Sequence, residues 1–291
     1  MKFRFLPFIS AVISSAVLLI LSFPPFSVWI AAYLFAVPLL VYLMRSLSEN
    51  YPSGGKMKSA LISRAAFGAA LAGEIGYGAI LYWIFPTVVE HTGSALQGVI
   101  SLALISGYLS FYVTVFFVLF AAALLLLKDI KIYPAALLIL IPPFFWVALE
   151  YVRSSVFTGF PWAVMGYSQW NFTPALWVAR YGGVFAVSFM IVLANMVFAG
   201  IFFLKKTEPL HRMVFAILII WLGLGFFEKC PRKNSKSYTD YIPVSVIQPS
   251  IDQDKKWDAE YYYEIKNIIL RLVIESSGKD KTASQKHFLS D

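Results

Sequence analysis

Few side chains in this sequence could do chemistry, and two of them, Glu150 and Arg153, stand three residues apart in a stretch rich in aromatic residues. At that spacing on a helix a carboxylate and a guanidinium share one face and can pair, which lowers the cost of placing both near lipid. The Gly-Phe-Pro-Trp segment that follows, with Phe160 and Trp162, predicts a rigid, non-helical turn. Two interpretations stay open: an interfacial aromatic belt, or a vestibule for lipid at the membrane surface.

Two other residues invite a chemical role. Glu74 lies within an apolar run, where an ionisable residue is a functional candidate by default, although the glycines around it more simply indicate close helix packing. Cys230 is the single cysteine; a nucleophilic thiol needs a base or a positive site, and its surroundings offer no such arrangement beyond Glu228. The three histidines lie far apart in the sequence, so we expect neither a metal site nor a cofactor.

The amino-acid composition indicates the kind of protein in which these residues lie. Of 291 residues, 59% are hydrophobic and 14% charged, whereas soluble chains have about 45–50% and about 25%. This excludes a cytosolic globular enzyme and a disordered chain, and it indicates a multi-spanning membrane protein.

We expect about seven transmembrane helices, because about 20 apolar residues cross the hydrocarbon core. The fourth is longer than a perpendicular crossing needs, so it should tilt or project from the bilayer. The expected spans are Phe5–Ser22, Phe26–Met44, Ala60–Phe85, Gly98–Leu127, Tyr133–Tyr151, Gly183–Leu204 and Val214–Phe227.

The placement of Lys and Arg predicts the orientation. With the N-terminus inside, the inner segments carry 11 basic residues, whereas the outer connections carry only Arg153 and Arg180. This asymmetry follows the positive-inside rule. It predicts a multi-pass membrane protein with a cytoplasmic N-terminus and a tail outside the cytoplasm. The net charge is +8, but most of the basic residues in the apolar body lie in the inner segments, where they set the orientation in the membrane. We therefore do not expect nucleic-acid binding.

The tail differs from the apolar body. We expect a transmembrane helical domain in residues 1–228, a linker in 229–243, a strand and a helix in 244–275, and a polar, disordered tail in 276–291. The β-branched run Val244–Ile247 predicts a buried strand, and Trp257 lies in a polar loop. Asp258 can cap an amphipathic helix from Ala259 to about Glu275. One strand and one helix cannot bury a core of their own.

Together these features resemble the apolipoprotein N-acyltransferase family of bacteria. The resemblance covers essentially all of residues 1–275, and the combination of TGFPW…GYSQ with Q-P-x-I-x-Q-x-x-K-W-D is its most specific part. The matching stretches are LSFPPFSVWIAAYLFAVPLL, GYGAILYWI, EYVRSSVFTGFPWAVMGYSQ, YGGVFAVSFMIVLAN and VSVIQPSIDQDKKWD.

The resemblance implies an all-α multi-spanning membrane domain followed by the incomplete start of a nitrilase-like αββα domain. It implies transfer of an acyl chain from a phospholipid, the acyl donor, to the α-amine of diacylglyceryl-cysteine in an apolipoprotein, the acceptor. The family uses a Cys nucleophile, a Glu base and a Lys that stabilises the oxyanion. The candidates for the substrate or lipid vestibule are Glu150, Arg153, Phe160, Trp162 and Trp257.

The sequence departs from the family where the chemistry would be. The W-P-E and C-Y-E motifs and the family's Lys do not occur in these residues, and Cys230 does not match the nucleophile. We therefore expect no catalytic residue here, a chain truncated early in its nitrilase-like domain, and no activity by this chain alone. Two alternatives are a non-enzymatic multi-pass membrane protein, such as a small transporter, and one half of a split enzyme.

Overall fold

The computed structural model describes residues 5–48, 55–127, 134–156, 159–203, 209–227 and 244–287. The chain divides into two compact units, Met1–Cys230 and Pro231–Asp291. In the described ranges all regular structure is helical.

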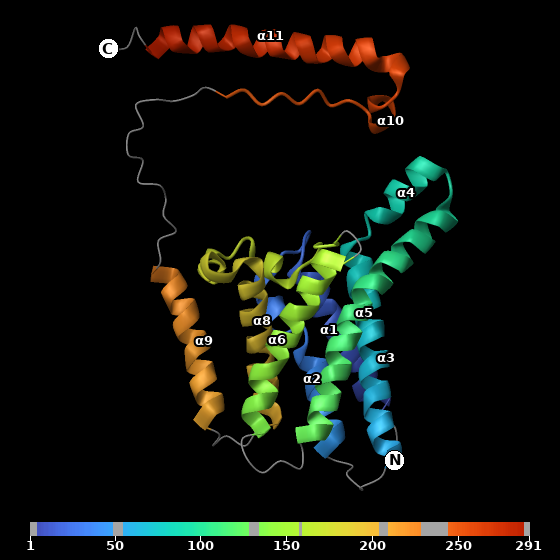
Figure 1. Ribbon diagram of the computed structural model, residues 1–291, viewed down its shortest axis with the longest axis vertical. Helices are drawn as coiled ribbons and strands as arrows, with labels where there is room; N and C mark the ends of the chain where they lie inside the picture. The colour runs from blue at the N-terminus through green and yellow to red at the C-terminus, as the bar shows by residue number, and fades with distance from the viewer. Residues whose placement is uncertain are drawn as a thin grey trace. The chain divides into compact units, whose positions relative to one another are not determined.

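The first unit is a bundle of helices (Figure 1). Five segments are long and apolar enough to cross a membrane, or six if the bent pair α3–α4 counts as one span. The apolar part of α9, Arg212–Phe227, is shorter, so the expected count of seven stays a prediction. The elements are α1 (Phe5–Ser22), η1 (Trp29–Tyr33), α2 (Val37–Ser48), α3 (Gly55–Ile80), α4 (Ile84–Thr92), α5 (Ala95–Leu127), α6 (Pro134–Ser155), η3 (Met165–Gln169), α7 (Thr173–Leu176), α8 (Ala179–Phe203) and α9 (Pro209–Phe227).

The expected span Phe26–Met44 is not one α-helix, because a turn separates the 3₁₀-helix η1 from α2. The side chain of Asn195, on α8, bonds to the backbone on both sides of this turn. The Ala36 N–H donates to its Oδ1 at 2.9 Å, and its Nδ2 donates to the carbonyl of Ala32 at 2.8 Å. A buried backbone group must find some partner, and here a side-chain amide replaces the missing helix bonds.

The expected span Ala60–Phe85 is also interrupted. Helix α3 ends at Ile80 and the chain bends by 63° into α4. Pro86 lies in the first turn of α4, where its missing N–H costs nothing, whereas in a continuous helix its ring would clash with the carbonyl of residue 82. Gly93, with φ of 68°, ends α4 in the left-handed conformation.

Helix α5 has 33 residues, a length of about 50 Å against a hydrocarbon core of about 30 Å. Its N-terminal turns pack against α4 at Gly98, where a Cβ atom would lie 2.8 Å from Val89 and 2.9 Å from Phe85. Figure 1 shows this pair extending past the ends of the neighbouring helices of the bundle, as expected for a helix longer than one crossing.

The core of the first unit fixes the position of α6, which carries the candidate site. The buried ring of Trp146 packs edge-on against Phe35, at 5.3 Å between centroids, and against Phe116 of α5, at 5.0 Å. Helix α8 has the largest buried share among the long spans, 61% of its apolar window. It therefore forms much of the surface on which α2 and α6 pack.

The second unit contains α10 (Gln253–Lys256), η4 (Ala259–Tyr261) and α11 (Tyr262–His287). The expected strand Val244–Ile247 stays a prediction, because this stretch has no regular secondary structure in the described residues and Val246 is 92% exposed. A strand needs a neighbouring strand for its hydrogen bonds, and 244–287 contains none. The nitrilase-like fold therefore stays a prediction.

The helical part of this unit agrees better with the sequence. Asp258 caps as predicted, since its side chain accepts a hydrogen bond from the Glu260 N–H at 2.9 Å. The helix continues to His287, beyond the expected end at Glu275 and into the stretch expected to be disordered. The linker 229–243, with Cys230, lies outside the described residues.

Candidate functional site

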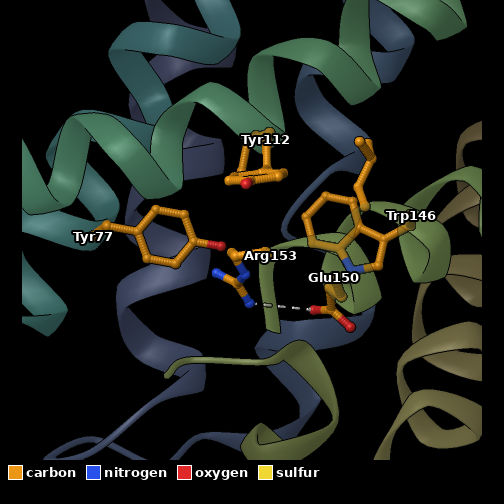
Figure 2. A pocket seen from close by; sticks show the side chains of 7 residues that line it. Tyr77, Tyr112, Trp146, Glu150 and Arg153 are labelled. Atoms are coloured by element: carbon orange, nitrogen blue, oxygen red, sulfur yellow. Dashed lines mark ion pairs between the residues drawn. The ribbon is translucent and has the colours of Figure 1, made fainter. Parts of the chain in front are cut away.

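Glu150 and Arg153 lie near the end of α6 and are buried, with 4% and 1% of their surfaces exposed. Arg153 Nη2 and Glu150 Oε1 are 4.0 Å apart, which confirms the pairing expected from their spacing. Figure 2 shows the two charged groups facing each other, with Trp146 one helical turn earlier. Two charges removed from water are tolerated only as a pair, so each depends on the other.

Three helices enclose this pair. Tyr77 comes from α3 and Tyr112 from α5, and Figure 2 shows the Tyr77 hydroxyl pointing toward the Arg153 guanidinium. Between them lies a cavity of about 10 Å³, roughly the room that one water needs. Glu150 Oε2, Arg153 Nε and the indole N–H of Trp146 have no hydrogen-bond partner among the described residues.

The pair also fixes the loop that follows α6. The Met165 N–H donates to Glu150 Oε1 at 2.7 Å, and the Phe160 N–H donates to the Arg153 carbonyl at 2.9 Å. Gly159 makes the turn possible with φ of 82°, and a Cβ atom there would lie 2.2 Å from the carbonyl oxygen of Ser154. The predicted non-helical turn is therefore confirmed.

Gln169 joins this loop to η1 and was not singled out from the sequence. The Tyr33 hydroxyl donates to Gln169 Oε1 at 3.0 Å, and Gln169 Nε2 donates to the carbonyl of Trp29 at 3.1 Å. Its side chain is fully buried. The available signal was a lone amide in an apolar region, where a polar residue usually bonds to another segment.

A cluster of aromatic rings lies in the loop after α6 and at the end of α3. Phe160 stacks on Trp162 with centroids 5.4 Å apart, and Trp162 lies 4.9 Å from Trp83. Trp162 is 45% exposed and lines a hollow of about 400 Å³. Three stretches that are distant in the sequence contribute to this hollow: Phe23, Pro24 and Pro25; Ile80, Leu81, Tyr82 and Trp83; and Trp162, Ala163 and Tyr167.

The remaining candidates lie apart from this cluster. Trp257 belongs to the second unit and is 83% exposed, with the Lys256 ammonium 5.8 Å from its ring centre. Its role in a vestibule stays a prediction. Glu74 is on α3 beside Ser106. In the described ranges no three His, Cys, Asp or Glu side chains gather in a metal-binding arrangement.

This arrangement is suited to holding an apolar ligand rather than to making bonds. Glu150 and Arg153 are enclosed, and Glu150 accepts a hydrogen bond from the loop, whereas the groups that reach the hollow are aromatic rings and aliphatic side chains. Pockets of this kind bind mainly through apolar contact.

Comparison with known proteins identifies the family. The family model for the apolipoprotein N-acyltransferase N-terminal domain matches residues 15–197. An apolipoprotein N-acyltransferase of Geobacter metallireducens is 31% identical over 89% of this chain and 46% of its own length. Those of Haemophilus influenzae and Pasteurella multocida are 28% and 27% identical, over 95% and 92% of this chain and 48% and 47% of their own lengths.

The chain thus spans about half the length of the curated relatives it matches. The matched domain includes α6, the aromatic loop and most of α8, so it contains the whole arrangement around Glu150 and Arg153. This sequence is a member of the apolipoprotein N-acyltransferase family.

Proposed function

We propose that this chain forms the membrane part of an apolipoprotein N-acyltransferase, and that the hollow beside Trp162 is the vestibule for its lipid substrates. The donor is a phospholipid, and the acceptor is the diacylglyceryl-cysteine of an apolipoprotein. Within this function, Glu150 and Arg153 hold the loop, and Phe160 and Trp162 contact acyl chains. Trp257, which belongs to the second unit, is proposed as a lipid contact of that unit.

The observation that carries the proposal is the convergence of three family-like stretches on one hollow. The Phe-Pro-Pro turn, the end of α3 and the loop after α6 line it together. Its surface is mostly apolar, and burying apolar area stabilises a complex by about 25 cal/mol per Å². A lipid chain therefore suits the hollow better than a polar ligand.

Photocrosslinking tests the vestibule directly. Trp162 is replaced by p-benzoylphenylalanine, and the chain is placed in nanodiscs with increasing amounts of a tagged phospholipid. Crosslinking at this position should saturate, and a diacylglyceryl-cysteine lipopeptide should reduce it. The matched control is the same replacement at Phe144, an exposed ring on α6 that does not line the hollow. A linear yield at Trp162 that ignores the lipopeptide, as expected for Phe144, would refute the vestibule.

The bond-making step is proposed to need residues other than these 291. Neither W-P-E nor C-Y-E occurs in them, and an acyl-enzyme step needs a nucleophile with a base within reach. Cells depleted of their own acyltransferase and supplied with this chain should keep lipoproteins without an N-acyl group, as read by mass spectrometry. Restored N-acylation would show that a catalytic set lies within this chain.

The orientation is proposed from the basic residues. With α9 as a seventh crossing, the chain lies in the bacterial inner membrane with its N-terminus in the cytoplasm and residues after about Glu228 outside. Reporters active only outside the cytoplasm should be active after Glu90 and Asp240 and silent after Asp129. Silence after Asp240 with activity after Glu90 would remove α9 from the count.

A further inference from the structure

The small cavity beside the buried ion pair lies where α3, α5 and α6 meet, and Glu150 and Arg153 line it. Its volume of about 10 Å³ is roughly that of one water-sized probe, so it admits a single water molecule and no larger ligand. It shares no lining residue with the hollow at Trp162. The other side chains at this cavity include Tyr77 of α3, Tyr112 and Val113 of α5, and Trp146 of α6.

Three of the lining residues stand on one face of α6. Trp146, Glu150 and Arg153 follow one another at spacings of four and three residues, which are neighbouring positions along one side of a helix. All three side chains are buried. Figure 2 shows the indole nitrogen of Trp146 turned toward the Glu150 carboxylate, which faces the Arg153 guanidinium. The sequence thus brings a neutral donor, an anion and a cation to one small space.

Several polar atoms in this space lack a hydrogen bond within the described ranges. They are three donors, Trp146 Nε1, Arg153 Nε and Arg153 Nη2, and one acceptor, Glu150 Oε2. The ion pair does not supply the bond, because its 4.0 Å separation exceeds hydrogen-bond length. The other carboxylate oxygen, Oε1, already accepts from the Met165 N–H. Buried polar groups nearly always have a partner, either in the protein or in ordered water.

The chemistry of these atoms selects the ligand. A cation would be repelled by the guanidinium and an anion by the carboxylate, so the site favours a neutral molecule. That molecule must accept hydrogen bonds from the indole and the guanidinium, and it must donate one to the carboxylate. Water does both, and a buried water typically makes about three hydrogen bonds.

We propose that one ordered water molecule occupies this cavity and bridges Trp146, Glu150 and Arg153. It accepts hydrogen bonds from Trp146 Nε1 and from the guanidinium, and it donates one to Glu150 Oε2. The bridge completes the hydrogen bonding of a carboxylate whose other oxygen holds the loop at Met165. The water is therefore part of the buried network that ties α6 to the loop after it, and it does not depend on any lipid in the vestibule.

NMR measures contact between water and a single indole. The full chain, isotope-labelled at its tryptophan indole nitrogens, is placed in detergent micelles, and magnetisation transfer from water to each indole N–H is recorded. The Trp146 signal, identified by its loss in Trp146→Phe, should show a cross-peak at the water frequency with the sign of dipolar transfer rather than of chemical exchange. Absence of this cross-peak would overturn the proposal without any further variant.

Trp221 provides the matched control within the same spectrum. Its indole N–H is also buried and has no hydrogen-bond partner among the described residues, but Trp221 lines neither this cavity nor the hollow at Trp162. It should show no water cross-peak. Equal cross-peaks at Trp146 and Trp221 would indicate general entry of water into the bundle and would contradict a specific site.

Two substitutions separate a water in the cavity from other sources of the signal. Val113→Ile adds a methyl group to the cavity wall and should remove the cross-peak while the Trp146 indole signal remains. Val192→Ile makes the same change at a buried valine of α8 that does not line the cavity, and it should leave the cross-peak unchanged. A cross-peak that persists in Val113→Ile would come from exchangeable side-chain protons, such as the Tyr77 hydroxyl, and the proposed water would be wrong.

Discussion

The buried pair gives the sharpest prediction about stability, through a double-mutant cycle with Glu150→Leu and Arg153→Met. Each single substitution leaves one charge buried without its partner, which costs about 3–5 kcal/mol. Glu150→Leu also removes the acceptor of the Met165 N–H, which adds about 1–3 kcal/mol. We therefore expect Glu150→Leu to be the more damaging of the two.

The double variant removes both charges at once. It retains the cost of the orphaned Met165 N–H but no longer buries an unpaired ion, so its loss should be several kcal/mol smaller than the sum of the two single losses. The free energy of unfolding is measured in mixed micelles titrated with a denaturing detergent, with tryptophan fluorescence as the signal.

The matched control is the exposed pair of Arg271 and Glu275 on α11. Its atoms are also 4.0 Å apart, but its side chains are 71% and 58% exposed. Arg271→Met should cost less than about 1 kcal/mol. If the losses of Glu150→Leu and Arg153→Met simply add in the double variant, the two charges do not depend on each other and the reasoning about the buried pair is wrong.

Three further predictions concern two substitutions in the first unit and the stability of the second unit. Gly159→Ala should unfold the loop after α6, because its Cβ would overlap a carbonyl oxygen. Gly93→Ala is the control, because Gly93 has the same sign of φ but open space around it. In thermal unfolding Gly93→Ala should cost only about 1 kcal/mol of stability. Asn195→Leu should cost about 1–3 kcal/mol for each backbone group left unpaired between η1 and α2, and a neutral result would show that this turn holds itself. By hydrogen exchange, residues 244–275 should open more readily than α5, because their apolar side chains are largely exposed; equal protection would indicate a partner surface.

Local sequence patterns predicted much of the fold. The bounds of α1 equal those expected from its apolar run, and spacing alone predicted the pairing of Glu150 with Arg153. The cap at Asp258 was likewise readable. These features depend on residues within one or two turns of one another, so a sequence pattern contains them.

The features that local sequence patterns did not predict depend mostly on contacts between residues far apart in the sequence. The break between η1 and α2 is stabilised by an amide about 160 positions later in the chain, and no local pattern announces it. The interruption before α4 had a local signal in Pro86, which the length of the apolar run outweighed. The strand expected at Val244–Ile247 is a different case and stays a prediction, because its β-branched pattern needs a neighbouring strand and the described residues contain none.

The central claim is that this chain is the membrane domain of an N-acyltransferase, and a chimera tests it most directly. The chain is joined to the part of the Geobacter metallireducens relative that follows the matched region, and it is expressed in cells depleted of their own enzyme. Mass spectrometry of lipoprotein N-termini should show an added N-acyl group, which the substitution of Glu150 and Arg153 weakens. A chimera that reaches the membrane in the same amount as the intact relative but leaves lipoproteins without the N-acyl group would contradict the claim.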